Sequence, residues 1–333
     1  MGTFGRIGMQ INQLDAVISR LGFRYIHDQQ LIQPLWGGYG ELIRVQVDDT
    51  SLIVKHIQLP KPEHHPRGWN SDLSHQRKLH SYQVELRWYQ QYAVNCGVNC
   101  RVPGPLLVEQ QGEQLLLVME DLAQAGFART SQQASDTQRS ACLRWLACFH
   151  ALHMGNSGNG LWPTGTYWHL ATRPEELEAL VDQELKQAAD KLDTILTHAP
   201  FQTLVHGDAK LANFCFTADD SEAAAVDFQY VGRGCAMKDV ALFISSAVDP
   251  DQCQQLEQSL LDEYFHYLAQ ALATYQPKIS SAQVITTLRP LYAIAWADFQ
   301  RFLKGWCPDH WKINPYSEQL TQSALVKLAD YPD

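Results

Sequence analysis

Residues 204–214 read LVHGDAKLANF, and three polar residues follow the apolar start of this stretch: His206, Asp208 and Asn213, in the pattern H-x-D-x-x-x-x-N. A loop that leaves a strand can hold a catalytic side chain and expose it at the same time. An aspartate that faces a substrate hydroxyl and an asparagine that binds a metal ion require about this spacing. We therefore interpret Asp208 as a candidate catalytic residue and Asn213 as a candidate metal ligand. The His206 ring is expected to order the loop.

A second candidate metal ligand follows fourteen residues later. The stretch AAAVDFQYVGRG (223–234) places Asp227 directly after an apolar strand pattern. Magnesium binds a few oxygen ligands and keeps several of its waters. The amide oxygen of Asn213 and the carboxylate of Asp227 are ligands of this type. The two residues predict a magnesium site that can serve a nucleotide triphosphate.

Length and composition narrow the class of protein. The chain has 333 residues, which favours two domains or lobes, and its formal net charge is −10. A net-acidic chain is a poor candidate for nucleic-acid binding, which relies on a basic face. No apolar run approaches the 18 residues of a membrane span. The eight cysteines contain no C-x-x-C pair, and their scatter through apolar stretches favours buried, reduced thiols in a cytoplasmic protein.

The texture of the sequence changes along the chain. From Leu31 the pattern reads strand, glycine turn, strand, polar turn (Asp48-Asp49-Thr50) and strand, and residues 104–122 read as a hairpin that ends at an acidic corner. Residues 60–75 read as a loop rich in Pro and His, and 203–231 as a short β region. Apolar residues at helical spacing predict helices at 8–21, 74–93, 136–154, 174–195, 251–275 and 281–304. This predicts a small β-rich N-terminal lobe (1–119) joined near Met119–Leu122 to a larger, mainly helical lobe (120–333).

The N-terminal lobe carries its own candidate site. Gly37, Gly38 and Gly40 lie between two predicted strands, where glycine lets the backbone approach a phosphate, although a glycine hairpin is often only structural. Lys55 stands in the apolar strand SLIVKHI; it either points to solvent at a strand edge or pairs with phosphate or a carboxylate. Glu85, in the middle of the 74–93 helix, is either that carboxylate or a solvated helix residue.

The order of these parts is more specific than any one of them. A glycine turn, a strand lysine, a helix glutamate, an acidic hinge, H-x-D-x-x-x-x-N and a strand followed by Asp-Phe form the protein-kinase series. The chain resembles the kinase-like superfamily of aminoglycoside phosphotransferases and choline kinases. HGDAKLANF, VDFQYVGRG and KDVALFI are most similar to its ecdysteroid-kinase-like branch, and the resemblance covers about residues 30–310.

The resemblance implies an α+β, bilobal, protein-kinase-like fold and a role for each matching residue. The N-terminal lobe (1–119) would bind nucleotide, and the C-terminal lobe (120–333) would carry catalysis and the acceptor. Lys55 would contact the ATP phosphates and Glu85 would pair with it; both count among the catalytic residues with Asp208. The glycine turn and Lys55 would bind ATP, and Asn213 and Asp227 would bind Mg2+. The adenine of ATP would contact the hinge residues Met119, Glu120 and Leu122. Asp239 would brace the catalytic loop.

Departures from the protein-kinase pattern narrow the substrate. Gly207 stands where protein kinases carry the Arg of H-R-D, and no A-P-E segment follows Asp227. The second acidic residue common after the Asp-Phe of antibiotic-modifying relatives is absent, since Gln229 follows Phe228. A protein substrate controlled through an activation loop is therefore not expected, and the acceptor is expected to be the hydroxyl of a small molecule.

The acceptor is expected to lie near residues 160–170 and 296–311. These stretches are rich in aromatic residues and contain two aspartates, which suits a cation such as an amine, or a flat apolar alcohol. The same aromatic residues can instead form core. The candidates are Trp162, Tyr167, Trp168, Asp298, Trp306, Asp309 and Trp311.

Together these features predict an enzyme that uses ATP and Mg2+ to phosphorylate a hydroxyl of a small molecule: an alcohol, an amino alcohol such as choline, or a sterol-like compound. Two alternatives remain open: a non-catalytic, nucleotide-binding pseudokinase and an aminoglycoside-modifying phosphotransferase. The sequence leaves the acceptor, the choice of ATP over GTP and the oligomeric state undetermined.

Overall fold

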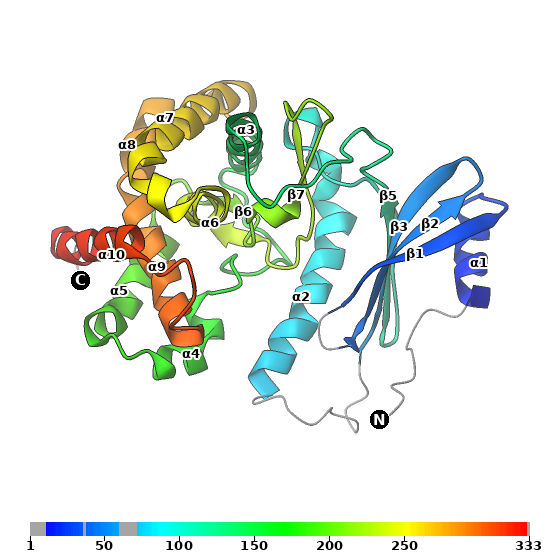
Figure 1. Cartoon of the computed structure of the whole chain (residues 1–333), viewed down its shortest axis with the longest axis horizontal. Coiled ribbons are helices and arrows are strands. Elements are labelled where there is room, and N and C mark those ends of the chain that lie inside the picture. Colours follow the sequence, from blue (N-terminus) through cyan, green and yellow to red (C-terminus); the bar gives the residue numbers. More distant parts are fainter. Residues whose placement is uncertain (1–10, 36–37, 60–71, 332–333) are drawn as a thin grey trace. The chain divides into compact units, whose positions relative to one another are not determined.

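The structure is a computed structural model that describes residues 11–35, 38–59 and 72–331. The chain divides into two compact units, which Figure 1 draws with their elements labelled. Unit 1 consists of Met1–Asn95 and Val102–Ala128, and unit 2 of Cys96–Arg101 and Arg129–Asp333. Unit 1 therefore ends at Ala128, and the short segment Cys96–Arg101 inside its span belongs to unit 2. The sequence predicts a single boundary, between residues 119 and 120.

Unit 1 is built on a five-stranded antiparallel sheet with the strand order β1-β2-β3-β5-β4. The predicted polar turn joins β2 to β3, with Val47 paired to Thr50. The β-rich character predicted for this part of the chain is confirmed. The strands are β1 (Ile26–Pro34), β2 (Gly40–Val47), β3 (Thr50–Gln58), β4 (Pro105–Gln111) and β5 (Gln114–Glu120).

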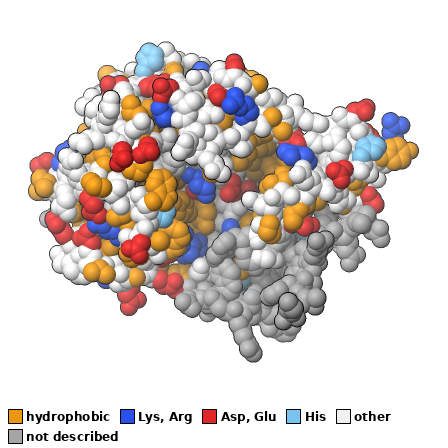
Figure 2. Space-filling view, viewed as in Figure 1, with side chains coloured by type: hydrophobic (Ala, Val, Ile, Leu, Met, Phe, Trp, Pro, Cys, Tyr) orange, Lys and Arg blue, Asp and Glu red, His pale blue; other side chains and the backbone are white. Residues whose placement is uncertain are grey.

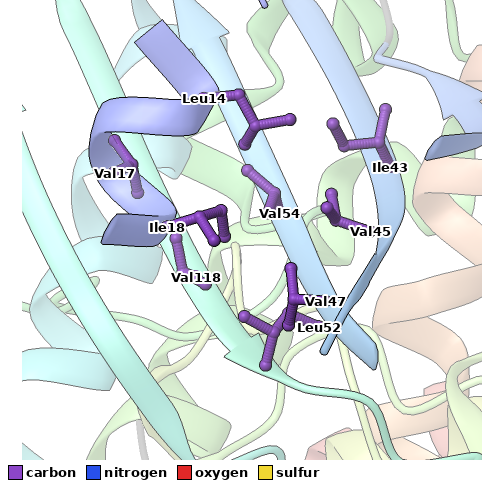
Figure 3. Packing of buried hydrophobic residues seen from close by; sticks show 9 residues of the cluster. All are labelled: Leu14, Val17, Ile18, Ile43, Val45, Val47, Leu52, Val54 and Val118. Atoms are coloured by element: carbon purple, nitrogen blue, oxygen red, sulfur yellow. The ribbon is translucent and has the colours of Figure 1, made fainter. Parts of the chain in front are cut away.

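The two faces of this sheet have different partners because strand side chains alternate between them. On one face, α1 (Ile11–Arg20) buries an aliphatic cluster, drawn in Figure 3. Its members are Leu14, Val17, Ile18, Ile43, Val45, Val47, Leu52, Val54 and Val118. On the other face, Ile57 of β3 packs with Tyr82 and Leu86 of α2 (Asp72–Gln91). Lys55 is two residues from Ile57 and therefore shares the α2 face.

Unit 2 is mainly helical. Its helices are α3 (Asp136–Leu152), α4 (Pro174–Ala179), α5 (Gln183–His198), α6 (Met237–Ala247), α7 (Pro250–Tyr275), α8 (Ser281–Leu288), α9 (Leu291–Trp306) and α10 (Pro315–Lys327). Every residue of α9 from Leu291 to Leu303 is buried, as expected for a helix that is surrounded by others, and α4, α5, α6 and α10 all lie against it.

Two short antiparallel pairs carry the polar motifs of unit 2. The strand β6 (Thr203–Val205) pairs with β9 (Gly232–Gly234), and β7 (Phe214–Phe216) pairs with β8 (Ala223–Ala225). The short 3-10 turns are η2 (Ala93–Asn95) in unit 1 and η3 (Val98–Cys100), η4 (Leu170–Thr172), η5 (Leu211–Asn213) and η6 (Leu328–Asp330) in unit 2.

Several predicted helices differ from the observed ones. The 174–195 helix is two helices, because Asp182 caps a new N-terminus by accepting a hydrogen bond from Leu185 N at 3.1 Å. The 281–304 helix is likewise interrupted, and Pro290 precedes the first residue of α9. Helices α6 and α10 were not predicted from the sequence. Most of the loop predicted at 60–75 lies outside the described residues, and α2 already begins at Asp72.

The sequence predicts that the cysteines are buried; Cys100, Cys142, Cys235 and Cys253 are buried, and the other four are partly exposed. All eight cysteines are free thiols. Figure 2 shows acidic and basic side chains interspersed over the visible face of unit 2. None of the helices in the described ranges is both long enough and apolar enough to cross a membrane.

Candidate active site

The loop after β6 is held by a buried carboxylate from α6. Asp239 Oδ2 accepts a hydrogen bond from His206 N at 2.5 Å, and Oδ1 accepts one from Gly207 N at 2.9 Å. His150 Nε2, on α3, donates to the same Oδ2 at 3.1 Å, and its Nδ1 accepts from the hydroxyl of Tyr264 at 2.8 Å. These bonds fix the backbone that precedes Asp208.

The His206 ring has both of its nitrogens engaged. Its Nε2 lies 3.0 Å from the carbonyl oxygen of Val226, so this nitrogen carries the proton. Its Nδ1 accepts from Asp208 N at 3.2 Å. The ring is therefore a neutral bridge between the loop and the residue before Asp227.

Gly207 occupies a position that only glycine can fill. Its φ is +79°, in the left-handed region that favours glycine. A Cβ at this position would lie 2.0 Å from the carbonyl oxygen of Tyr230. The departure from the Arg of protein kinases thus has a local steric cause, which is the close approach of the turn that contains Tyr230.

Asp208 is buried and its two oxygens differ. Its Oδ2 accepts from Lys210 Nζ at 2.8 Å and from Asn213 Nδ2 at 3.1 Å. Its Oδ1 is buried and has no hydrogen-bond partner among the described residues. Burial raises the pKa of the Asp208 carboxyl, and Asp227 adds to this, while Lys210 opposes it. Burial by itself would lower the pKa of Lys210, but Asp208 raises it overall.

The geometry of Asn213 and Asp227 suits a divalent cation. The amide nitrogen of Asn213 is committed to Asp208, at 2.8 Å from its carbonyl oxygen and 3.1 Å from Oδ2, which leaves the Asn213 amide oxygen for a ligand. Val226 N donates to Asn213 O at 2.9 Å, so Asp227 is one residue beyond this pair. An amide oxygen and a carboxylate are suitable magnesium ligands. Three or more His, Cys, Asp or Glu side chains arranged for a metal ion do not occur in the described ranges.

Asp227 has a left-handed backbone, with a φ of +67°. Aspartate tolerates this region better than most residues, and such conformations cluster at functional sites. Gln229 Nε2 donates to Asp227 Oδ1 at 2.8 Å. The turn after β8 therefore aims the carboxylate, and Gln229 contributes to its orientation.

Within unit 1, Lys55 and Glu85 form the ion pair considered from the sequence. Lys55 Nζ lies 2.6 Å from Glu85 Oε2, and both side chains are buried. The tip of Lys55 also lies 6.0 Å from the centre of the Tyr82 ring. The strand-edge and solvated-helix interpretations of these two residues do not describe the structure.

The other predicted nucleotide residues lie at the ends of strands in unit 1. Gly40 has a φ of +155°, and a Cβ there would lie 2.0 Å from His56 O, so the start of β2 requires glycine. Gly38 also has a positive φ, and Gly37 lies outside the described residues.

At the predicted hinge, Met119 and Leu122 are buried, while Glu120 accepts from Gly104 N at 2.5 Å. The hydrogen bond shows that the Glu120 side chain is tied to the β4 side of the sheet. Asp121, which the sequence analysis passed over, accepts hydrogen bonds from Arg44 and from Ser51, both at 2.6 Å.

The candidate acceptor residues separate into buried and exposed groups. Trp168 and Asp298 are fully buried and bonded to each other, with Nε1 3.0 Å from Oδ2, so we correct their assignment from acceptor wall to core. Trp162 is also buried and donates to Gln229 O. Tyr167 is half-buried and lies beside Asp208. Burial raises the pKa of Tyr167, and the negative charge of Asp208 raises it further. The exposed members are Trp306, Asp309 and Trp311.

Two lysines near Asp208 were missed by the sequence analysis. Lys210 lies inside the HGDAKLANF motif itself, two residues after Asp208, so the motif contained the signal. Lys312 lies between α9 and α10, about a hundred residues away, and its charge interacts with those of Asp208 and Lys210. No local pattern distinguishes Lys312 from a surface lysine.

Comparisons with known proteins agree with this fold and site. The sequence pattern of the phosphotransferase enzyme family matches residues 32–277, so the chain belongs to this family. Within it, the described geometry gives the chain a kinase-like unit 1 and a helical unit 2. A search of curated protein sequences found no match.

Solved structures resemble the chain over almost its whole length. A protein of Ralstonia eutropha JMP134, provisionally described as an aminoglycoside phosphotransferase, shares 12% identity, covers 96% of each chain and gives a TM-score of 0.52. The amicoumacin kinase hAmiN, in complex with AMP-PNP, Ca2+ and Ami, shares 13% identity over 96% of each chain, with a TM-score of 0.51. The choline kinase LicA from Streptococcus pneumoniae shares 13% identity, covering 96% of this chain and 99% of LicA, with a TM-score of 0.48. The TM-scores of the first two structures show a shared fold, and identities this low leave the substrate open.

Proposed function

We propose that this phosphotransferase moves the γ-phosphoryl group of ATP, in the presence of Mg2+, to a hydroxyl of a small molecule. The observation that carries the proposal is the Asp208 carboxylate. Lys210 and Asn213 hold its Oδ2, and its Oδ1 is buried without a hydrogen-bond partner among the described residues. A buried carboxylate oxygen without a partner is costly unless a ligand supplies the donor. The acceptor hydroxyl is that donor.

In the reaction, Asp208 Oδ1 orients the acceptor hydroxyl and takes its proton as the oxygen bonds to the γ-phosphorus. The bond from the γ-phosphorus to the bridging oxygen breaks, and ADP carries away that electron pair. Phosphoryl transfer depends mainly on positioning and charge neutralisation. Asp239 and His206 keep the Asp208 backbone fixed, and Lys210 keeps its side chain aimed.

The remaining residues bind the nucleotide and its metal ion. Lys55, aimed by Glu85, neutralises phosphate charge. Asn213 and Asp227 would hold Mg2+, which supplies charge neutralisation at the phosphate oxygens when it is bound. The glycine turn at 37–40 and the hinge residues Met119, Glu120 and Leu122 contact the rest of the nucleotide. The AMP-PNP and Ca2+ in the hAmiN complex support a nucleotide and a divalent cation as the first ligands to test.

The test is a screen for acceptor-stimulated ADP release by the purified chain. Alcohols, amino alcohols, sterols of the ecdysteroid type, sugars and aminoglycosides form the panel. Asp208→Asn is expected to lower kcat by roughly 10²-fold or more, because an amide can position a hydroxyl but cannot take its proton. Nucleotide affinity, measured by calorimetry, should stay close to that of the parent.

The outcomes separate the competing functions. A kcat within a few-fold of the parent in Asp208→Asn would make Asp208 a structural loop residue. Nucleotide binding without turnover of any acceptor would favour the pseudokinase. Aminoglycoside turnover, with raised tolerance in a host that expresses the chain, would favour the antibiotic-modifying enzyme.

The eight free thiols suit an enzyme of the reducing cytoplasm.

A further inference from the structure

The surface beside Asp208 in unit 2 is basic and aromatic. Lys312 Nζ lies 3.0 Å from the hydroxyl of Ser245 on α6. The same ammonium lies 5.4 Å from the centre of the Phe299 ring on α9 and 5.5 Å from that of Trp311. The two rings and the Ser245 hydroxyl fix the ammonium in one place, as cation–π contacts do.

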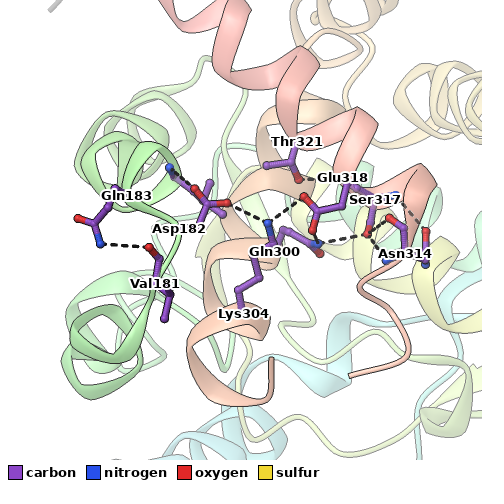
Figure 4. Close-up of polar contacts among 10 residues, drawn as sticks. Val181, Asp182, Gln183, Gln300, Lys304, Asn314, Ser317, Glu318 and Thr321 are labelled. Carbon is purple, nitrogen blue, oxygen red and sulfur yellow. Dashed lines mark hydrogen bonds and ion pairs between the residues drawn. The ribbon is translucent and has the colours of Figure 1, made fainter. Parts of the chain in front are cut away.

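Lys312 differs from other partly buried cations of unit 2 in its partners. Lys304 is bonded to Asp182 at 2.9 Å and to Glu318 at 2.8 Å, as Figure 4 shows. Within the described part of the chain, Lys312 has no carboxylate within 4.0 Å, so no ion pair is available to its ammonium. A partly buried ammonium without an anionic partner favours binding an anion.

Two carboxylates of unit 2, Asp298 and Glu176, are already neutralised by cations. Asp298 is enclosed by Lys238, at 3.4 Å, and by Arg301, at 2.9 Å. Burial by itself would raise the pKa of Asp298, but these two cations lower it overall. Glu176 is paired with Arg173 at 2.9 Å. Of the two aspartates expected to form an acidic wall, Asp298 therefore provides no free negative charge for a cationic acceptor, while Asp309 is exposed to solvent.

Hydrogen bonds connect the surroundings of Lys312 to the loop of Asp208. Leu211 N donates to Ser246 Oγ at 2.9 Å, next to the Ser245 hydroxyl that Lys312 contacts. Tyr167 N donates to Gly207 O at 3.2 Å.

Burial lowers the pKa of Lys312 to about 8, while the Asp208 carboxylate raises it and Lys210 lowers it further. Two aromatic rings link the surroundings of Asp208 and Lys312. Burial and the Asp208 charge raise the pKa of Tyr167, the Tyr167 and Phe299 ring centres are 6.4 Å apart, and the Phe299 ring contacts the Lys312 ammonium.

We propose that Lys312 binds an anionic group of the acceptor, so that the substrate is a hydroxylated acid, with a carboxylate or a phosphate or sulfate ester, rather than a cationic amino alcohol or aminoglycoside. The inference rests on the proposed kinase function and specifies its acceptor. The hydroxyl lies at Asp208 Oδ1, the anion at Lys312, and the carbon frame against the half-buried Tyr167. Lys312 is a specificity-determining residue and takes no part in the transfer of the proton.

The first experiment compares matched acceptors that differ in one charge. Glycerate and gluconate are tested against their primary amides, with choline and kanamycin as cationic acceptors. Lys312→Met is expected to raise the KM of the acids at least 10-fold, to leave the KM of the amides unchanged and to change kcat less than 3-fold. Lys312→Arg, which keeps the charge, should retain most of the affinity. Lys327→Met removes an exposed lysine of α10 and is the control.

Preference for choline, kanamycin or the amides, with equal KM values in Lys312→Met and the parent, would overturn the inference and leave the kinase function intact. A second arm does not depend on turnover. Binding of inorganic sulfate is measured by calorimetry with Mg·ADP at saturation, in the parent, Lys312→Met and Lys327→Met. At least a 10-fold loss of sulfate affinity in Lys312→Met alone supports the inference, and equal affinity in all three proteins contradicts it.

Discussion

Lys55 Nζ lies 2.6 Å from Glu85 Oε2, and their side chains are only 7% and 2% exposed. The pair joins the third strand of the unit 1 sheet to α2 across thirty residues of sequence. Removing one partner of a buried pair leaves an unpaired charge, which costs several kcal/mol. The pair therefore links the position of α2 to that of the side chain that we propose to bind phosphate.

A double-mutant cycle tests this coupling. Lys55→Met and Glu85→Gln are each expected to lower kcat/KM at least 10-fold, and the double variant should lose less than the sum by about 1 kcal/mol or more. Arg20 and Glu109 form an exposed ion pair in the same unit and provide the control cycle, which should give little coupling. Free-energy losses that add in full for Lys55 and Glu85 would mean that the two residues act independently.

Gly207→Ala tests the steric account of the catalytic loop. The new Cβ would lie 2.0 Å from Tyr230 O at a φ of +79°, so the variant should lose about 2 kcal/mol or more of unfolding free energy and most of its turnover. Gly155 has a similar φ of +82° with no atom within 4 Å of a new Cβ, so Gly155→Ala isolates the backbone strain and should lose about 1 kcal/mol. Urea denaturation measures both. Equal losses would refute the close approach as the cause.

Asp227→Ala is expected to abolish phosphoryl transfer and weaken the binding of magnesium nucleotide while the fold is retained. The φ of +67° makes Asp227→Asn the sharper variant, because Asn tolerates this region and only the charge is lost. The Mg2+ concentration needed for half-maximal turnover by Asp227→Asn, and for half-maximal nucleotide binding by both variants, should rise, whereas Asp190→Ala, at an exposed position of α5, should change neither. An unchanged magnesium dependence in both Asp227 variants would remove Asp227 from the metal site.

His153 is expected to make unit 2 sensitive to acid. Burial, with a smaller contribution from His150, lowers the pKa of His153 to about 4. Below pH 6.5 the His153 side chain of the unfolded chain binds a proton, whereas that of the folded chain does not until about pH 4. The contribution of His153 to the free energy of unfolding is therefore complete above pH 6.5 and is lost as the pH falls toward 4. The expected loss between pH 7 and pH 5 is about 2 kcal/mol.

The measurement is urea denaturation of the parent, His153→Gln and His198→Gln at the two pH values. His153→Gln should remove about 2 kcal/mol of the pH dependence, and His198→Gln, at an exposed position, should leave it unchanged. The same pH dependence in all three proteins would show that His153 does not contribute to the acid sensitivity.

Much of the fold could be predicted from local patterns. Alternating apolar residues gave the strands of unit 1, and the turn at Asp48-Asp49-Thr50 lies where β2 meets β3. Helix ends were less predictable. Asp182 interrupts the pattern at 174–195 because its side chain caps the N-terminus of α5 and also accepts a hydrogen bond from Lys304, 122 residues away. A break that depends on a distant partner leaves no periodic signal in the sequence.

The sequence by itself determined the family and the candidate catalytic loop, since His206, Asp208 and Asn213 act through short spacings and hydrogen bonds between neighbours along the chain. Only the tertiary structure decided the chemistry of the surroundings. Asp298 is neutralised by Lys238 and Arg301 and bonded to Trp168, 130 residues away, while Lys312 stands near Asp208 without an ion pair in the described part of the chain. The physical reason is that the charge available to a ligand depends on which ions lie within a few ångströms, and packing sets those distances.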